Sequence, residues 1–165
     1  MSAQKLIQLF KRRELSMDRK MILLVEDNPD DVELTLRTFR KNHILNGIVV
    51  ARDGAEALDY VFGSGIYAGR DPMDTPQLIL LDLKLPKIDG LEVLQRIRFD
   101  ERTECIPVVI LTSSKEEQDV IQGYQLGVNS SYLRKPVDFN QFAQSMKQLG
   151  LYWLVLNEPF PEKNQ

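Results

Sequence analysis

The stretch Leu-Ile-Leu-Leu-Asp at residues 78–82 is the part of the sequence that says most about the fold. Leu78 to Leu81 are all apolar, so both faces of the segment suit burial, which is typical of a central strand in a helix-covered parallel sheet. The residues that follow, Leu83 to Gly90, include Pro86 and predict a turn. A central strand would therefore present Asp82 at its carboxyl end, beside a loop.

Short apolar runs of the same kind recur along the chain and alternate with segments of helical periodicity. We expect the strands at Met21 to Val25, Ile48 to Ala51, Leu78 to Leu81, Pro107 to Leu111 and Ser131 to Arg134. Five consecutive β-α units with right-handed crossovers predict an α/β fold, a doubly wound five-stranded parallel sheet with helices on both faces. We expect the flavodoxin-like strand order 2-1-3-4-5.

Capping residues mark where the helices begin. Candidate caps with a side-chain oxygen stand at Asn28, Asp53, Ser114 and Asp138. After the first cap, Pro29 suits the first helical position, and Asp30 and Asp31 favour the positive end of a helix. Ser114 with Glu117 matches a capping box, which predicts a helix that stops at Gly127. Three glycines and two prolines between residues 63 and 76 predict a long surface loop.

The length of 165 residues and the hydrophobic content of 43% are enough for the core of one domain. We expect a poorly ordered basic leader at residues 1–20, one domain at 21–150, and a tail at 151–165 that is first apolar and then polar. A separate effector domain is not expected at this length. Any output would therefore come from the surface of the domain itself.

The charge balance argues against a nucleic-acid or membrane binder. Lys and Arg number 21 against 24 Asp and Glu, a net charge of −3, whereas such surfaces need a strong basic excess. The leader holds six of the basic and two of the acidic residues, which leaves 15 basic against 22 acidic elsewhere. The lone Cys105 excludes an intramolecular disulfide, and no apolar run approaches the roughly 20 residues of a membrane span. We expect a cytoplasmic protein with no nucleic-acid and no membrane partner.

Chemically reactive side chains follow the predicted strands at their carboxyl ends, where doubly wound sheets bind ligands. They are Glu26 and Asp27 after the first strand, Asp82 after the third, Thr112 after the fourth and Lys135 after the fifth. Three acids in one crevice repel one another, so such a cluster usually holds a cation. Oxygen ligands with room for water suit Mg²⁺, with Mn²⁺ as a possible substitute.

An aspartate carboxylate can attack phosphorus to form an acyl phosphate when a cation screens the incoming oxygens. Asp82 is the best nucleophile, because it ends the central strand. Asp27 would bind the metal directly, and Glu26 would do so directly or through water. Thr112 and Lys135 would bind two phosphoryl oxygens.

These residues occur in a recognisable pattern. Leu-Val-Glu-Asp-Asn at 24–28, Leu-Leu-Asp-Leu-Lys-Leu-Pro-Lys-Ile-Asp-Gly at 80–90, Thr112-Ser113 and Lys135-Pro136 together resemble the receiver domain of two-component response regulators. The resemblance covers Met21 to Leu149. It implies a phosphoacceptor signalling protein rather than an enzyme. The protein would receive a phosphoryl group from a histidine kinase on Asp82, and it would assist its own phosphorylation and dephosphorylation.

The resemblance also implies details of the site. It places Mg²⁺ at Glu26, Asp27, Asp82 and the backbone carbonyl of Lys84, and a cis peptide bond before Pro136. It makes Thr112 and Tyr132 a switch, in which the threonine moves toward the phosphoryl group and the aromatic ring follows.

The loop at 63–76, the tail and the lack of an effector domain resemble single-domain regulators that serve phytochrome kinases. The downstream protein target is not identified by the sequence. The apolar run Leu151 to Leu156 would be sticky if it were left in water, so we expect either packing on its own domain or a homodimer that uses the tail and the face beside Tyr132.

Three alternatives stay open from the residues. An aspartyl-phosphate phosphatase would want a second acid two residues after Asp82, where the chain has Lys84. A flavodoxin-like FMN-binding module would want a phosphate-binding loop after the first strand, where Glu26 and Asp27 repel phosphate. A receiver-like interaction module that is never phosphorylated is the third alternative.

Overall fold

Five parallel strands form one sheet in the computed structural model, in the predicted order β2-β1-β3-β4-β5. The strands are β1 (Ile22–Val25), β2 (Ile48–Ala51), β3 (Leu78–Asp82), β4 (Val108–Thr112) and β5 (Ser130–Arg134). The structure describes residues 2–8, 21–44, 46–113, 115, 117, 129–151, 154 and 155. All five residues of β3 are buried, which confirms that the strand at 78–82 is the central one.

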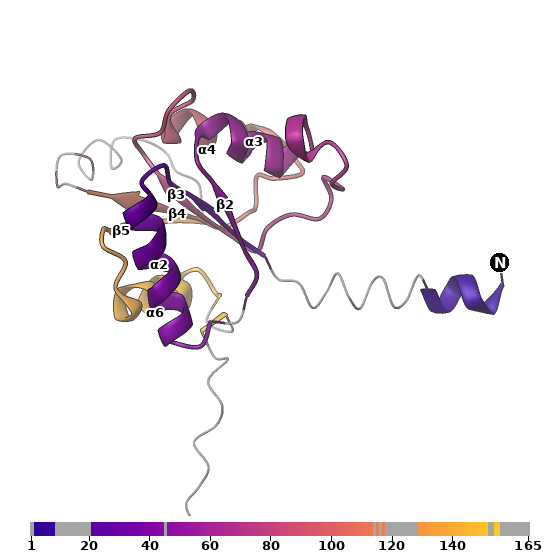
Figure 1. Ribbon diagram of the computed structural model, residues 1–165, viewed down its shortest axis with the longest axis horizontal. Helices are drawn as coiled ribbons and strands as arrows, with labels where there is room; N and C mark the ends of the chain where they lie inside the picture. Colours follow the sequence, from indigo (N-terminus) through magenta and orange to yellow (C-terminus); the bar gives the residue numbers. More distant parts are fainter. Residues whose placement is uncertain are drawn as a thin grey trace, which may run out of the picture.

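The helices cover both faces of the sheet, as predicted for a doubly wound fold (Figure 1). They are α2 (Pro29–Lys41), α3 (Gly54–Phe62), α4 (Gly90–Phe99) and α6 (Phe139–Gln148), with a short 3₁₀ turn η1 (Gly65–Tyr67). Because side chains alternate along a strand, odd and even positions of β3 serve different layers. Ile79 and Leu81 pack with α3 and α4, and Leu78 and Leu80 pack with α2 and α6.

Three of the predicted caps are confirmed. The side chains of Asn28, Asp53 and Asp138 each accept hydrogen bonds from backbone N–H groups in the first turn of the helix that follows. The fourth predicted cap, Ser114, and nearly all of the helix predicted to end at Gly127 lie outside the described residues. Within the described part, Glu117 accepts hydrogen bonds from the backbone N–H of Ser113 at 2.7 Å and from its hydroxyl at 3.1 Å.

The segment between residues 63 and 76 is more regular than the predicted loop. It contains the 3₁₀ turn η1, and Arg70 folds back onto α3. The Arg70 guanidinium lies 4.0 Å from the centre of the Tyr60 ring and donates a 2.6 Å hydrogen bond to the carbonyl of Tyr60. Contacts between these two residues give the segment an order that its glycines and prolines do not predict.

The structure describes a part of the chain at each end of the domain. Residues 3–8 are helical, and Leu6 and Ile7 in this segment are exposed; the poorly ordered leader at residues 1–20 stays a prediction. At the other end, Leu151, Leu154 and Val155 are buried in the same core cluster as α2 and α6. These three tail residues therefore pack on their own domain, and the rest of the apolar run lies outside the described residues. Among the helices that the structure describes, none has the length and apolar character needed to cross a membrane.

Candidate functional site

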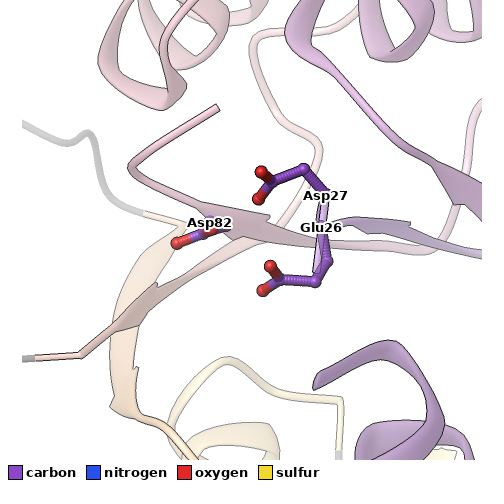
Figure 2. A group of neighbouring side chains, drawn as sticks. All are labelled: Glu26, Asp27 and Asp82. Atoms are coloured by element: carbon purple, nitrogen blue, oxygen red, sulfur yellow. The ribbon is translucent and has the colours of Figure 1, made fainter. Parts of the chain in front are cut away.

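The acid cluster forms where β1 and β3 end side by side. Val25 pairs with Leu81 in the parallel register, so Glu26 and Asp82 leave neighbouring strands at the same edge. Figure 2 shows the carboxyl groups of Glu26, Asp27 and Asp82 reaching from these two strand ends toward a common space. Carboxylate oxygens of all three residues lie within 4.8 Å of one another. The structure thus brings together the three acids that the sequence predicted.

Lys135 reaches the cluster from the end of β5. Its ammonium nitrogen Nζ lies 3.0 Å from Glu26 Oε2, 3.2 Å from Asp31 Oδ2 and 3.5 Å from Asp82 Oδ2. The backbone of Lys135 is held by a 2.7 Å hydrogen bond from its N–H to the carbonyl of Thr112. The bond between Lys135 and Pro136 is cis, as the resemblance implied. The lysine predicted for the site is therefore in place.

Burial sets the electrostatics of the carboxyl groups. The Glu26 side chain is only 1% exposed. Burial raises the pKa of Glu26 to about 7, although the hydrogen bond from Lys135 opposes the shift, and the charge of Asp82 adds to it. Burial likewise raises the pKa of Asp82, with the charge of Lys135 as the main opposing influence. Without a metal, the site therefore disfavours the simultaneous ionisation of Glu26 and Asp82.

The same surroundings act in the opposite direction on the lysine. Burial by itself would lower the pKa of Lys135, but the hydrogen bond to Glu26 and the charges of Asp82 and Glu26 outweigh burial and raise it. The ammonium therefore stays charged at neutral pH. A fixed positive charge beside Asp82 is well suited to bind an anionic group.

Thr112 ends β4, the strand next to Asp82, and is fully buried. Its hydroxyl Oγ1 donates a hydrogen bond to the backbone carbonyl of Leu133 at 3.2 Å, so it is directed at β5. On that strand, Tyr132 is 40% exposed. The two residues predicted as a switch therefore lie on paired strands, with the hydroxyl bonded to the residue next to Tyr132.

The loop after β3 passes close to the site because of a glycine. A β-carbon on Gly90 would overlap the carbonyl oxygen of Asp82, so this position accepts only glycine without a shift of the backbone. The N–H of Gly90 donates to the carbonyl of Leu83 at 2.9 Å. In the same loop the Lys84 ammonium lies 3.3 Å from Glu117 Oε1. Metal ligation by the backbone carbonyl of Lys84 stays a prediction.

Two residues near the site were missed as site residues by sequence reasoning. Asp31 was assigned only to the positive end of a helix and Glu117 only to a capping box, yet each contacts a lysine of the site region. The contact between Asp31 and Lys135 joins residues 104 positions apart. No local sequence pattern predicts such a pair, because it forms only when α2 packs near the segment that follows β5.

The cluster fits a divalent cation. Its ligand atoms are hard carboxylate oxygens with no sulfur or imidazole among them, which suits Mg²⁺ or Mn²⁺ rather than Zn²⁺. A bound cation would also favour the ionised forms of Glu26 and Asp82, which burial and the neighbouring negative charge disfavour. A metal bound at the acid cluster and the Lys135 ammonium would together bind the oxygens of a phosphoryl group at Asp82.

The doubly wound sheet with three acids around a lysine at one edge matches the fold and site of a known protein family. The model of the response regulator receiver domain matches residues 22–147. This span contains the acid cluster, Thr112, Tyr132 and Lys135, and the protein belongs to this family. Receiver domains bind a divalent metal at this acidic pocket and interact with histidine kinases, which makes the chain a two-component signalling protein.

Similar solved structures include response regulators that are named for phytochromes. The chain is 55% identical to the bacteriophytochrome response regulator AtBRR, with a TM-score of 0.77 over 84% of this chain and 98% of that one. It is 38% identical to the Mn²⁺-bound form of response regulator Rcp1, with a TM-score of 0.64 over 86% and 99%. Rcp1 is a protein of Synechocystis. The phosphorylated cyanobacterial phytochrome response regulator RcpA is 40% identical, with a TM-score of 0.65 over 82% and 94%.

Proposed function

We propose that this protein is a single-domain response regulator that accepts a phosphoryl group on Asp82 from a histidine kinase. The observation that carries the proposal is the position of Asp82, whose carboxyl group lies 3.5 Å from Lys135 Nζ and within 4.8 Å of the carboxyl oxygens of Glu26 and Asp27. The same carboxyl group is thus able to receive phosphorus and to share a metal. The phosphorylated state named for RcpA supports the proposal.

In the proposed transfer, an oxygen of Asp82 forms a bond to phosphorus while the bond between phosphorus and the kinase histidine nitrogen breaks. The electron pair of the broken bond stays on the imidazole, which leaves as the neutral ring once it carries one proton. Mg²⁺ held by Glu26, Asp27, Asp82 and the carbonyl of Lys84 would screen the phosphoryl oxygens. Lys135 and Thr112 would each hold one of the remaining oxygens, Lys135 by charge and Thr112 by its hydroxyl.

Phosphorylation with a small phosphodonor tests this assignment. Acetyl phosphate with Mg²⁺ should add one phosphoryl group to the chain, labile in base as acyl phosphates are, and Asp82→Asn should abolish it because an amide is not a nucleophile. Lys135→Ala should keep Mg²⁺ binding but weaken the response to phosphorylation, since Lys135 meets the incoming oxygens. Equal labelling of the Asp82→Asn protein in intact mass spectrometry would show that the acceptor is another residue.

The cellular setting follows from the same proposal. The donor would be a histidine kinase of the phytochrome type, because three similar structures belong to phytochrome systems or their regulators. We further propose that the protein acts in the cytoplasm and has neither nucleic acid nor a membrane as a partner. Incubation with a purified bacteriophytochrome kinase and labelled ATP tests it, and the expected result is label on this chain that Asp82→Asn removes.

Signalling would then proceed through protein contacts on the face that includes β5 and α6. A groove on this face is lined by residues of both elements, among them Tyr132, Arg134, Gln141 and Gln148. We propose a homodimer that uses the tail and the face beside Tyr132. The groove adjoins the switch residues, so phosphorylation at the sheet edge has a short route to it.

The alternatives have less support from the site. Lys84, at the position where a phosphatase would want its second acid, extends toward Glu117 instead of the acid cluster. An FMN module would have to bind phosphate next to Glu26 and Asp27. A receiver-like module that is never phosphorylated would be expected to lack a pocket residue, yet Glu26, Asp27, Asp82, Thr112 and Lys135 all stand at the same sheet edge.

A further inference from the structure

The Lys135 ammonium has three N–H donors, and three carboxylates lie within 4.0 Å of it in the described structure. Two of them, Glu26 and Asp82, belong to the acid cluster that suits a metal. The third, Asp31, belongs to a different element, the first turn of α2, and its Oδ2 atom lies 3.2 Å from Lys135 Nζ. The ion pair with Asp31 is therefore the one that leaves the metal and the phosphoryl position untouched.

The backbone of Asp31 is itself fixed. The side chain of Asn28 caps α2 and accepts hydrogen bonds from the N–H of Asp30 at 2.9 Å and from the N–H of Asp31 at 3.3 Å. The backbone of Lys135 is fixed on the other side by its hydrogen bond to Thr112. The Lys135 side chain between these two anchors has four methylene groups, and without its ion pairs it would populate many rotamers.

When a metal and a phosphoryl group are bound, Glu26 and Asp82 would interact with them as well as with the Lys135 ammonium. A metal would draw on the oxygens of Glu26, and the phosphoryl group would occupy the space beside Asp82. We propose that Asp31 is a positioning residue for phosphoryl transfer, which holds the Lys135 ammonium at Asp82 so that it meets the incoming phosphoryl oxygen. This inference rests on the proposed phosphorylation of Asp82.

The physical reason is preorganisation. A donor that already points at the place where the phosphoryl oxygen arrives loses little conformational entropy in the transfer, whereas an unrestrained lysine has to be ordered at that moment. The Asp31 side chain is 32% exposed, so water partly screens its charge, and its direct repulsion of the phosphoryl anion is small beside its attraction to the adjacent ammonium.

The chain supplies a matched control in Asp30. Asp30 and Asp31 are neighbours in the first turn of α2, with the same charge and the same relation to the helix dipole. Both Asp30→Ala and Asp31→Ala remove one negative charge from that turn, but only the second removes the Lys135 ion pair. A comparison of the two variants separates positioning from charge and from helix stability.

The experiment measures the rate of phosphorylation by acetyl phosphate at saturating Mg²⁺, together with Mg²⁺ affinity, for each variant. We expect Asp31→Ala to be roughly three- to tenfold slower than Asp30→Ala, with unchanged Mg²⁺ affinity, because the ion pair orients only Lys135. Asp31→Asn, which keeps the shape, should fall between them. In the Lys135→Ala background, Asp31→Ala should have no further effect, since the ammonium that it positions is gone.

The outcomes are distinguishable. If Asp31→Ala phosphorylates as fast as Asp30→Ala or faster, Asp31 does not position the lysine and the inference fails. A slowing that persists in the Lys135→Ala background would also overturn it, because the effect would then be a general one on the fold. If the unmodified chain is not phosphorylated on Asp82 at all, the proposed function itself fails, which the Asp82→Asn protein reveals independently.

Discussion

The hydroxyl of Thr112 donates its hydrogen bond to the carbonyl of Leu133, at 3.2 Å. Thr112 is thus bonded to β5 next to the exposed Tyr132, while the strand that bears it lies beside Asp82. A phosphoryl oxygen at Asp82 would compete with the Leu133 carbonyl for this hydroxyl. The proposed switch thus has a physical basis: the Thr112 hydroxyl can donate either to the Leu133 carbonyl or to a phosphoryl oxygen at Asp82.

We expect Tyr132 to become more buried when phosphoryl arrives, because movement of Thr112 toward Asp82 opens space beneath the ring. Fluorine NMR of fluorotyrosine-labelled protein, with beryllofluoride and Mg²⁺ as the phosphoryl analogue, should show a shift of the Tyr132 signal. The signals of Tyr60 and Tyr67, which lie at α3 and η1, serve as internal controls. In Thr112→Val the analogue should still bind but leave the Tyr132 signal in place, and a full shift in that variant would contradict the switch.

Millimolar Mg²⁺ should raise the melting temperature of the unmodified protein, because a ligand that binds only the folded state stabilises it by mass action. At a concentration 100 times the dissociation constant, the gain is about 2.7 kcal/mol. Asp27→Ala should remove most of this dependence and stabilise the metal-free protein, since it relieves repulsion with Glu26 and Asp82. Calorimetry with and without chelator measures both effects, and a melt indifferent to Mg²⁺ would count against the metal site.

The metal-free protein should lose stability as pH rises from about 4.5 to about 7. Glu26 has a folded pKa raised to about 7 from the ordinary 4.5, so in this window the folded state keeps a proton that the unfolded state has released. The contribution is on the order of 3 kcal/mol, present below the window and lost above it. Chemical unfolding in chelator should show the decline, and Glu26→Gln should flatten it.

Two controls sharpen this pH experiment. Glu33→Gln removes an exposed carboxylate of α2 that lies outside the site, and it should leave the decline unchanged. Saturating Mg²⁺ should reverse the trend, because metal binding requires ionised carboxylates and strengthens as pH rises. A stability curve that is flat in chelator, or equal in Glu26→Gln, would show that burial of Glu26 does not govern the site.

The proposed homodimer can be tested on the surface without disturbing the core. Truncation after Gly150 would remove the buried Leu154 and Val155, so a loss of assembly in that variant could come from lost packing. Tyr132→Ser on the exposed face and truncation after Val155 avoid this problem. In sedimentation velocity at tens of micromolar, the full chain should be a dimer and both variants more monomeric, with Leu34→Ser on α2 as the control.

A full chain that sediments as a monomer, with and without beryllofluoride, would contradict the dimer. An intact dimer in the Tyr132→Ser protein would place the interface elsewhere. Neither result would affect the assignment of Asp82, since the phosphoryl site lies at the sheet edge and is formed by one chain.

Local signals in the sequence were sufficient for the sheet and for most of the site. The run at 78–81 is apolar on both faces, which only a strand covered on both sides tolerates, and it is indeed central in the sheet. Since all carboxyl ends of a parallel sheet meet at one edge, Glu26, Asp82, Thr112 and Lys135 could be brought together from strand order alone. Capping residues such as Asn28 and Asp138 bind the first turn of the helix that follows them, so they too could be predicted from the sequence.

What the tertiary structure decided are contacts between residues far apart in the chain. The ion pair of Asp31 with Lys135, the raised pKa of Glu26 and the hydrogen bond of Thr112 to Leu133 depend on how closely elements pack and on how much water they exclude. Likewise, the sequence alone shows Leu154 and Val155 only as part of an apolar run, and the tertiary structure shows that they are buried in the core. Sequence periodicity records which face of an element is buried, but distances and burial between elements arise only when the faces meet.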